Sequence, residues 1–228
     1  RVEALAGRLV DGEPLQYVEG FTSFRGYRLA CDRRALVPRP ETEQLVEAAL
    51  AFEPAWRTGR PRMADVGTGS GCIAVAMACS HPRVIVHASD VSGEALELAR
   101  VNVQRHGLAD RVRLVQSDLL DACEAGSLDL VISNPPYVAS AALAALPAEV
   151  RLYEPVQALD GGSDGLHVLR RLVPRAREKL RPGGALFVEI GEQQGRAVRL
   201  LMETHGFGHV RVQQDLAGRD RIARGVIT

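Results

Sequence analysis

Asn134, Pro135, Pro136 and Tyr137 follow an apolar run, SLDLVIS, that is typical of a buried strand. Two consecutive prolines cannot continue a central strand, because neither has the backbone N–H that a sheet ladder needs. The strand must end here, and the Asn134 side-chain oxygen and the Pro135 carbonyl can then accept two hydrogen bonds from one NH2 group. Tyr137 can pack its ring against a planar group. We therefore predict that Asn134, Pro135 and Tyr137 are catalytic and that, together with Pro136, they bind the substrate.

The chemistry that suits such a site is attack by a weakly nucleophilic nitrogen. The lone pair of an amide or aromatic amine is delocalised, and two acceptors on its N–H bonds raise the electron density on nitrogen and aim it. Positioning can supply most of the rate, and the proton can leave after the new bond has formed. The alternative is that NPPY is only a stiff turn. Its place at the end of a core strand, beside a glycine-rich loop, favours catalysis.

That glycine-rich loop, DVGTGSGC, follows the first strand of the alternating part of the chain. Glycines at such a turn let the backbone approach a ligand closely, and open α/β sheets bind ligands at the carboxyl ends of their strands. The competing motif is the dinucleotide fingerprint GxGxxG, but here Cys72 stands where the last glycine would be. The spacing favours a loop that binds S-adenosylmethionine (SAM), and we predict cofactor contacts from Gly67, Thr68, Gly69, Ser70 and Gly71.

Acidic residues close the next two predicted strands. Asp90 ends HASD, and a carboxylate there can accept hydrogen bonds from both ribose hydroxyls. Asp118 ends VQSD, where it can face an adenine amino group, and Leu119 can pack on the adenine ring. We predict that all three bind the cofactor. The alternative for each is a turn or cap, and Asp90 in particular could cap the helix that follows it.

These residues need a scaffold of alternating strands and helices. Apolar runs predict strands at 62–66, 83–90, 111–118, 127–133, 185–190, 209–215 and 220–228. Helices are predicted between most of them, at 71–80, 92–107, 164–180 and 192–206. This alternation predicts an α/β fold with a Rossmann-like, doubly wound, mostly parallel seven-stranded sheet, closed by an antiparallel terminal hairpin. The strand at 127–133 is expected beside the strand at 62–66, so NPPY and the glycine loop would share one crevice.

The first residues form a separate predicted unit. A helix is expected at 1–13, a β-hairpin at 15–30 and a further helix from Pro40, because proline suits the first turn of a helix. We expect a helix and β-hairpin linker at residues 1–36 and the SAM-binding α/β domain at residues 37–228. The chain begins at Arg1, and the sequence leaves open whether a further segment precedes it.

Composition narrows the function classes. The formal net charge is zero, with 28 basic and 28 acidic residues among 228, which disfavours a general nucleic-acid binder. The four cysteines form no CxxC pair and no metal-ligand spacing, which indicates free thiols, a reducing and therefore cytoplasmic compartment, and no metal site. No apolar run approaches the ~20 residues of a membrane span, and no signal peptide is visible. We expect no membrane partner.

At this point the chain resembles the HemK/PrmC protein glutamine methyltransferases. The resemblance covers nearly the whole chain and rests on LQYVEGFTSFRGYRL, LVPRPETEQLV, DVGTGSGCIA, SNPPYV, YEPVQALDGGSDGL, LRPGGALFVEIGEQQG and DLAGRDRIARG. It implies a class I SAM-dependent methyltransferase that methylates the glutamine side-chain amide in the GGQ motif of peptide chain release factors. It also implies that Asn134 contacts the cofactor as well as the substrate.

The alternatives differ in substrate. NPPY is shared with enzymes that methylate adenine or cytosine amino groups in nucleic acids, which must flip the base out of its stack. PRPETE discriminates better, because relatives that methylate a glutamine of a ribosomal protein have PRSP there. A non-catalytic binder with the same fold is disfavoured by the intact motifs. Two features depart from the family: only the last helix of its helical N-terminal domain is present at best, and Leu119 stands where the family often has an aromatic residue.

Three further segments are open to two interpretations. VPRPETE, with Arg39 and Glu41, could cover the active-site mouth or be a stiff linker before a helix. The glycine-rich DGGSDG stretch could be a mobile wall of the substrate cleft or a plain loop. Glu189, at the end of a strand near the site, is expected to be a structural hydrogen-bond acceptor rather than a base.

Overall fold

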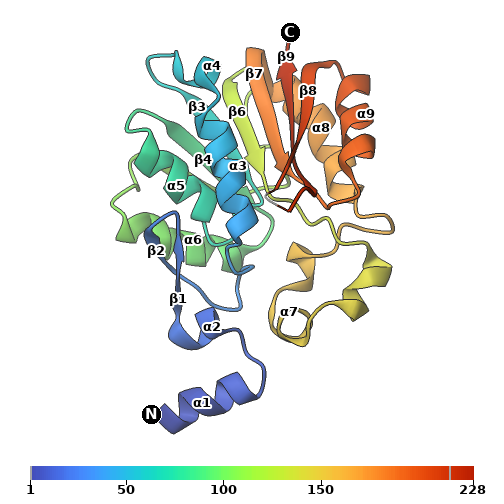
Figure 1. The fold of residues 1–228 in the computed structure, drawn as a ribbon. Helices are drawn as coiled ribbons and strands as arrows, with labels where there is room; N and C mark the ends of the chain where they lie inside the picture. The colour runs from blue at the N-terminus through green and yellow to red at the C-terminus, as the bar shows by residue number, and fades with distance from the viewer. Residues whose placement is uncertain (1, 216) are drawn as a thin grey trace.

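A computed structural model describes residues 2–215 and 217–228, and its centre is a seven-stranded sheet with the order β5-β4-β3-β6-β7-β9-β8 (Figure 1). The strands are β3 (Arg62–Val66), β4 (Ile85–Asp90), β5 (Val112–Gln116), β6 (Leu128–Ser133), β7 (Leu180–Glu189), β8 (Phe207–Gln214) and β9 (Asp220–Ile227). The first five strands pair in parallel, whereas β9 is antiparallel to both β7 and β8. The predicted α/β fold, the terminal hairpin and the pairing of β6 with β3 are confirmed.

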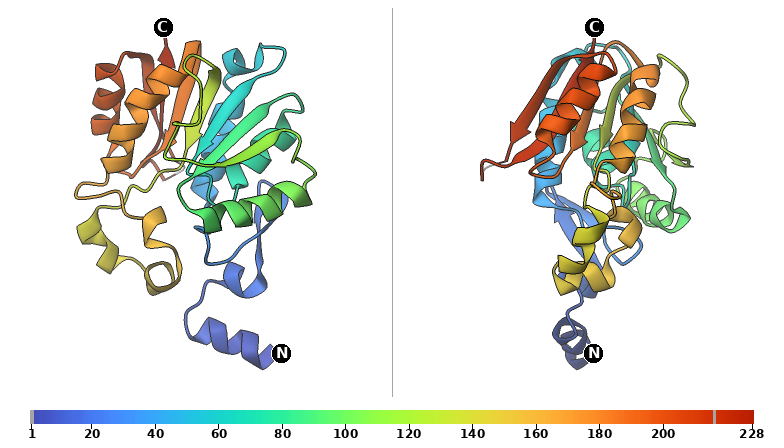
Figure 2. Two further views of the ribbon diagram at one scale, coloured as in Figure 1. Left: turned by 180° about the vertical axis from the view of Figure 1, so that it is seen from behind. Right: turned by 90° about the vertical axis from the view of Figure 1, so that its right-hand side faces the viewer.

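Helices cover both faces of the sheet (Figure 2). α3 (Pro40–Leu50), α4 (Glu53–Trp56) and α5 (Cys72–Ser80) pack on one face, and α8 (His167–Lys179) and α9 (Gly195–Thr204) pack on the other, while α6 (Gly93–Arg105) lies beside β4 and β5. Successive strand residues alternate between the two cores, as the strand period of two requires: Met63 lies in the first core and Ala64 in the second. Because both faces are buried, β6 is buried along its whole length, which explains its continuous apolar run.

The amino-terminal segment corrects one prediction. It holds α1 (Val2–Val10), α2 (Leu15–Glu19) and a two-stranded hairpin of β1 (Phe21–Phe24) and β2 (Tyr27–Ala30), while Arg1 lies outside the described residues. The prediction of a hairpin over 15–30 is therefore wrong for 15–19, where one helical turn starts after Pro14 and ends at Gly20 with φ of 76°. The helix buries Tyr17 and Val18, and alternation over so few residues does not separate a strand from a helical turn.

Other element bounds also differ from the predictions. β7 begins at Leu180 instead of residue 185, with an irregular register opposite Leu128 and Leu130 that accommodates Pro182. The stretch between β6 and α8, which had no predicted elements, holds short helices at Ser140–Ala145, Ala148–Tyr153 (α7) and Val156–Ala158. α8 begins three residues later than predicted, at His167. None of the helices in the described part of the chain is long and apolar enough to span a membrane.

Candidate active site

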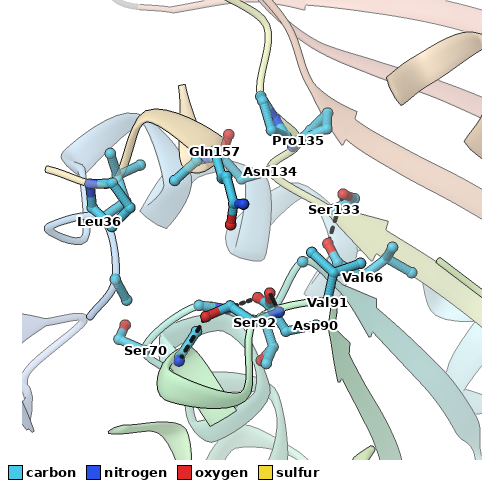
Figure 3. A pocket seen from close by; sticks show the side chains of 18 of the residues that line it. Leu36, Val66, Ser70, Asp90, Val91, Ser92, Ser133, Asn134, Pro135 and Gln157 are labelled. Carbon is cyan, nitrogen blue, oxygen red and sulfur yellow. Dashed lines mark hydrogen bonds between the residues drawn. The ribbon is translucent and has the colours of Figure 1, made fainter. Parts of the chain in front are cut away.

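A cavity of about 240 Å³ opens at the carboxyl ends of β3, β4 and β6, where the strand order reverses. Such a switch point is where open α/β sheets bind ligands. Residues of the glycine loop, Asp90 and the NPPY segment all line it, so the predicted cofactor and substrate residues do meet at one place. Figure 3 shows Asn134 and Asp90 facing the cavity from opposite sides.

The glycine loop is held at the end of β3 by backbone hydrogen bonds. The N–H groups of Gly67 and Thr68 donate to the Ser89 carbonyl at 2.9 and 3.0 Å. A Cβ on Gly67, which has φ of 69°, would meet no atom within 4 Å, so the loop leaves open space beside its backbone. Gly71 does not line the cavity, and a Cβ there would come within 3.2 Å of Ala99 on α6. Close helix packing therefore accounts for Gly71, and its contact with the cofactor stays a prediction.

Asp90 organises this loop from the end of β4. Its two carboxylate oxygens accept the N–H groups of Gly69 and Ser92, both at 2.9 Å. The helix cap proposed as the alternative is supplied by Ser92 instead, whose hydroxyl accepts the Ala95 N–H. Each oxygen of Asp90 keeps a further acceptor position. The carboxylate is therefore placed to take hydroxyl donors from a ribose in the cavity.

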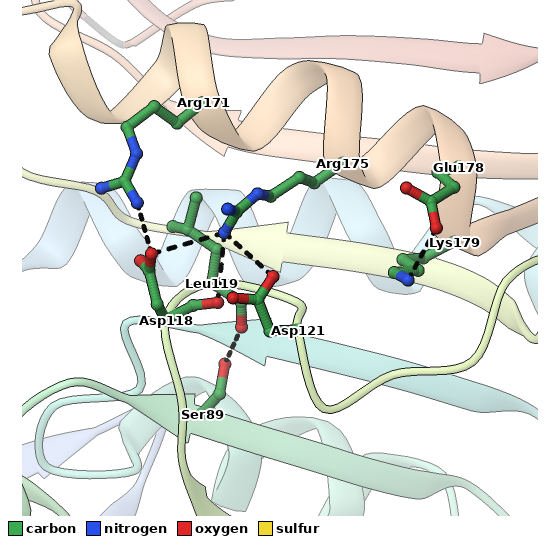
Figure 4. A network of polar contacts seen from close by, with 8 residues as sticks. All are labelled: Ser89, Asp118, Leu119, Asp121, Arg171, Arg175, Glu178 and Lys179. Atoms are coloured by element: carbon green, nitrogen blue, oxygen red, sulfur yellow. Dashed lines mark hydrogen bonds and ion pairs between the residues drawn. The ribbon is translucent and has the colours of Figure 1, made fainter.

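Asp118 and Leu119 also line the cavity, but Asp118 has partners that the sequence did not reveal. Its carboxylate pairs with Arg171 and, at 3.5 Å, with Arg175, both on α8 (Figure 4). The Leu119 backbone has φ of 51°, and its carbonyl accepts the Ser89 hydroxyl at 2.8 Å. The predicted adenine contacts stay predictions, and for Asp118 an adenine amino group would share the carboxylate with two guanidinium groups.

The NPPY segment is tied to two residues far away in the sequence. The Asn134 Nδ2 donates to the Thr42 hydroxyl at 2.9 Å, and that hydroxyl donates to Glu189 Oε2 at 2.7 Å. The Tyr137 hydroxyl donates to Glu189 Oε1 at 3.1 Å. Thr42 lies within PRPETE but was not singled out, whereas Glu189 was expected to be an acceptor, as it is. Tyr137 does not line the cavity, so its stacking on substrate stays a prediction.

Two acceptors remain available next to this network. Within the described residues, neither the Asn134 Oδ1 nor the Pro135 carbonyl accepts an intramolecular hydrogen bond, and both residues line the cavity. The prolines cause this, because β6 ends at Ser133 and no ladder continues past it. Two adjacent acceptors at a cavity wall can bind the two N–H bonds of one amide.

Two buried carboxyl groups at the site have perturbed acidities. Burial raises the pKa of Glu189, although the hydrogen bonds from Thr42 and Tyr137 favour the ionised form. Burial also raises the pKa of Asp65 to about 7, against hydrogen bonds from the Thr68 hydroxyl and the Ala74 N–H. Neither residue lines the cavity, but each accepts a hydrogen bond from a residue that does, Glu189 from Thr42 and Asp65 from Thr68.

The structure places the two segments whose role the sequence left open, PRPETE and DGGSDG. Arg39 of PRPETE lines the cavity and pairs with the buried Glu154 at 2.7 Å, joining α3 to the loop after α7. That loop contributes Pro155 and Gln157 to the cavity wall, while a Cβ on Gly165 would come within 2.3 Å of the Tyr137 carbonyl. PRPETE thus contributes to the lining of the site, and its predicted position over the mouth stays a prediction, while DGGSDG packs against NPPY.

The lining suits SAM. Asp90 offers a carboxylate for hydroxyl donors, Gly67 leaves space beside the backbone, and apolar side chains such as Leu36, Val66 and Val91 provide flat, non-polar walls (Figure 3). This combination fits the nucleoside part of SAM. The fold, the glycine loop and Asp90 together define a class I SAM-dependent methyltransferase.

Comparisons with known proteins identify the family. Residues 49–152 match the model of the methyltransferase small domain. Release factor glutamine methyltransferases from Moorella thermoacetica and Geobacter sulfurreducens are 45% and 43% identical to this chain. The alignments cover 94% and 98% of this chain and 75% and 76% of those proteins. The chain belongs to the release factor glutamine methyltransferase family, which confirms the resemblance found in its motifs.

Solved structures of methyltransferases resemble this fold. A release factor-specific protein-(glutamine-N5) methyltransferase from Alicyclobacillus acidocaldarius is 31% identical, with a TM-score of 0.51, covering 84% of this chain and 94% of that chain. A T. thermophilus 16S rRNA N2 G1207 methyltransferase in complex with AdoMet and guanosine has a TM-score of 0.65 at 18% identity, covering 91% of this chain and 50% of that chain. At that identity the second likeness shows the fold alone.

Proposed function

We propose that this chain transfers a methyl group from SAM to the side-chain amide nitrogen of the glutamine in the GGQ motif of peptide chain release factors. The observation that carries the proposal is the pair of unused acceptors, Asn134 Oδ1 and the Pro135 carbonyl, in the same cavity as the glycine loop and Asp90. The names of the relatives support the choice of substrate.

The residues of the chain act mainly by positioning. Bound SAM would supply a methyl group on a positively charged sulfur, whose bond to carbon breaks as the amide nitrogen attacks. Asn134 and Pro135 hold the two N–H bonds of the substrate amide, so its nitrogen faces the cofactor side of the cavity. Held this way, an otherwise weak nucleophile gains a high effective concentration. The nitrogen loses one proton after methylation.

The direct experiment is mass spectrometry of a purified, unmethylated release factor after incubation with the protein and SAM. We expect one added methyl group on the peptide that contains GGQ, and none when that glutamine is replaced by asparagine. Absence of methylation while calorimetry still detects SAM binding would contradict the proposal.

Methylation of a base amino group is the competing substrate class. The zero net charge disfavours it, because enzymes that act on DNA or RNA usually offer a basic surface. The same assay therefore includes single-stranded DNA and RNA, and we expect neither to gain a methyl group. We further propose that the protein acts in the cytoplasm, which is supported by its four free cysteines.

A further inference from the structure

Glu189 is a fully buried carboxylate whose two oxygens both point at hydroxyl groups. It closes β7 with an exposed fraction of 0%, and it accepts hydrogen bonds from Thr42 at 2.7 Å and Tyr137 at 3.1 Å. It does not line the cavity, so it does not reach a substrate directly. Any effect of Glu189 on the reaction must pass through these two partners.

The direction of the hydrogen bonds follows from the chemistry of the groups. The Thr42 hydroxyl donates its single proton to Glu189 Oε2, as it must when Glu189 is ionised, because an ionised carboxylate only accepts. The Thr42 oxygen can then only accept from its other neighbour, Asn134, 2.9 Å away. Asn134 must therefore turn its NH2 group toward Thr42 and its carbonyl oxygen away. This order follows from the ionised form of Glu189, which the hydrogen bonds from Thr42 and Tyr137 favour.

We propose that Glu189 is a positioning residue for methyl transfer, which through Thr42 holds the Asn134 side chain with its carbonyl oxygen, and not its NH2 group, toward the substrate amide. This inference rests on the proposed function. The opposite orientation would set the Asn134 NH2 group against the NH2 group of the substrate, donor against donor, and the substrate nitrogen would lose one of its two acceptors.

The surrounding structure makes this relay rigid. Thr42 has an exposed fraction of 2% and lies in the first turn of α3, whose N-terminal end begins with Pro40. Glu189 lies on a central strand paired on both sides. Water has little access to either side chain, so it cannot readily substitute for a missing partner. The relay also explains why PRPETE and NPPY, 92 residues apart at Thr42 and Asn134, belong to one site.

Thr42 gives the first test. Thr42→Val keeps the shape of the side chain but removes the hydroxyl, and we expect kcat to fall about 10–100-fold with the KM for SAM within about threefold, since only the orientation of Asn134 changes. Thr42→Ser restores a hydroxyl and should recover most of the lost rate. Equal kcat values for Thr42→Val and the wild type would overturn the proposal.

Variants of Glu189 give a second, independent test, which distinguishes its role as a hydrogen-bond acceptor from any effect of its negative charge. Glu189→Gln can turn its amide oxygen toward Thr42 and should keep most of the rate, whereas the similarly sized Glu189→Met offers no acceptor and should lose it. If both variants lose the rate equally, the negative charge and not the acceptor matters, and the relay is wrong. Glu192→Gln, a change of a half-exposed carboxylate three residues further on, is the matched control and should leave kcat unchanged.

A spectroscopic readout tests the relay without turnover. The side-chain NH2 signals of Asn134 in a ¹⁵N spectrum can be identified by their loss in Asn134→Ala. We expect these signals to shift in Thr42→Val and to return toward their wild-type positions in Thr42→Ser, with melting curves confirming that each variant is folded. Unshifted signals in Thr42→Val would overturn the relay. Failure of the wild type to methylate a release factor would instead overturn the proposed function and leave this readout intact.

Discussion

At the scale of single residues, the two sides of the cavity have different proposed roles, one toward the cofactor and the other toward the substrate. Asp90 lies on the side of the glycine loop, and Asn134 lies across the cavity on the side of NPPY (Figure 3). Each side chain already has one set of partners within the protein and still offers an acceptor to a ligand. Replacing Asp90 should therefore mainly lower the affinity for SAM, whereas replacing Asn134 should mainly lower kcat.

Asp90→Ala should weaken SAM binding by about 1.5–3 kcal/mol, which is the range for a lost hydrogen bond to a charged group. The loop also loses the acceptor for the Gly69 and Ser92 N–H groups, which adds to the effect. Isothermal titration calorimetry measures the dissociation constant for SAM in both proteins. A dissociation constant equal to that of the wild type would show that Asp90 does not hold the cofactor.

Asn134→Ala should show the reverse pattern. We expect SAM affinity to stay within about tenfold of the wild type while kcat falls by two or more orders of magnitude, since the lost acceptor orients the nucleophile. Calorimetry and a methyl-transfer assay on the same preparation separate the two quantities. Turnover at the wild-type rate would remove Asn134 from the proposed mechanism.

Asp65 adds a pH dependence of stability. Burial raises its pKa to about 7 in the folded protein, so between about pH 4 and 7 the folded state binds more protons at this group than the unfolded state does. The contribution of Asp65 to the free energy of unfolding must therefore fall as pH rises through this window. We expect Asp65→Asn to become more stable relative to the wild type from pH 4 to 7 in urea unfolding. A difference that is constant across this window would contradict the assigned pKa.

At the scale of elements, the loop before α8 packs closely against the NPPY segment. Gly165 has φ of 75°, and its backbone lies so close to the Tyr137 carbonyl that a Cβ would approach to 2.3 Å. Gln194, just before α9, donates to the carbonyls of both Tyr137 and Gly165, at 3.0 and 3.2 Å. Close packing against NPPY thus explains Gly161 and Gly165, whereas a Cβ on Gly162 would meet His167 instead.

Gly165→Ala tests this packing, and Gly107→Ala is its matched control. Both glycines have positive φ, but a Cβ on Gly107 would meet no atom within 4 Å. We expect Gly107→Ala to cost about 1 kcal/mol of stability from backbone strain alone with normal turnover. Gly165→Ala should cost more and reduce kcat at least tenfold, as measured by urea unfolding and the methyl-transfer assay. Similar results for the two variants would show that the contact with Tyr137 is unimportant.

At the scale of the whole molecule, the amino-terminal hairpin is joined to the main sheet through α6. Phe24 and Leu29 are buried in the same core as α3 and α5. Asn102 of α6 accepts the Ala30 N–H at 2.6 Å and donates to the carbonyls of Ala30 and Ser70, at 3.1 and 2.8 Å. One side chain thus joins the hairpin, a helix and the glycine loop, and the boundary at residues 36 and 37 stays a prediction about chain organisation.

Asn102→Ala should lower the free energy of unfolding by about 2–4 kcal/mol, because it leaves buried backbone groups without partners. It should also weaken SAM binding if the glycine loop binds the cofactor as predicted, since the Ser70 carbonyl belongs to that loop. Gln104→Ala, an exposed change on the same helix, should alter neither quantity. Chemical denaturation and calorimetry provide the measurements. Loss of stability without any change in SAM affinity would show that the hairpin and the cofactor loop are uncoupled.

The sequence alone determined the order of the seven main strands and placed the candidate site at their carboxyl ends. The apolar periods predicted the seven strands, Gly67 and Asp90 were predicted to bind the cofactor, and Asn134 and Pro135 were predicted to bind the substrate. The strands and the meeting of these residues at one cavity are confirmed, because they depend on local physics: proline ends a strand, glycine permits a tight turn, and parallel strands bring their carboxyl ends together.

Only the tertiary structure decided which side chains orient those residues. Thr42 and Glu189 lie 147 residues apart, and Arg171 pairs with Asp118 across 53 residues, so no local pattern reveals either pair. The helical turn at α2 likewise depends on the burial of Tyr17 and Val18 against the rest of the chain. Hydrogen-bond partners of buried groups are set by which elements pack together, and that packing is a property of the whole fold.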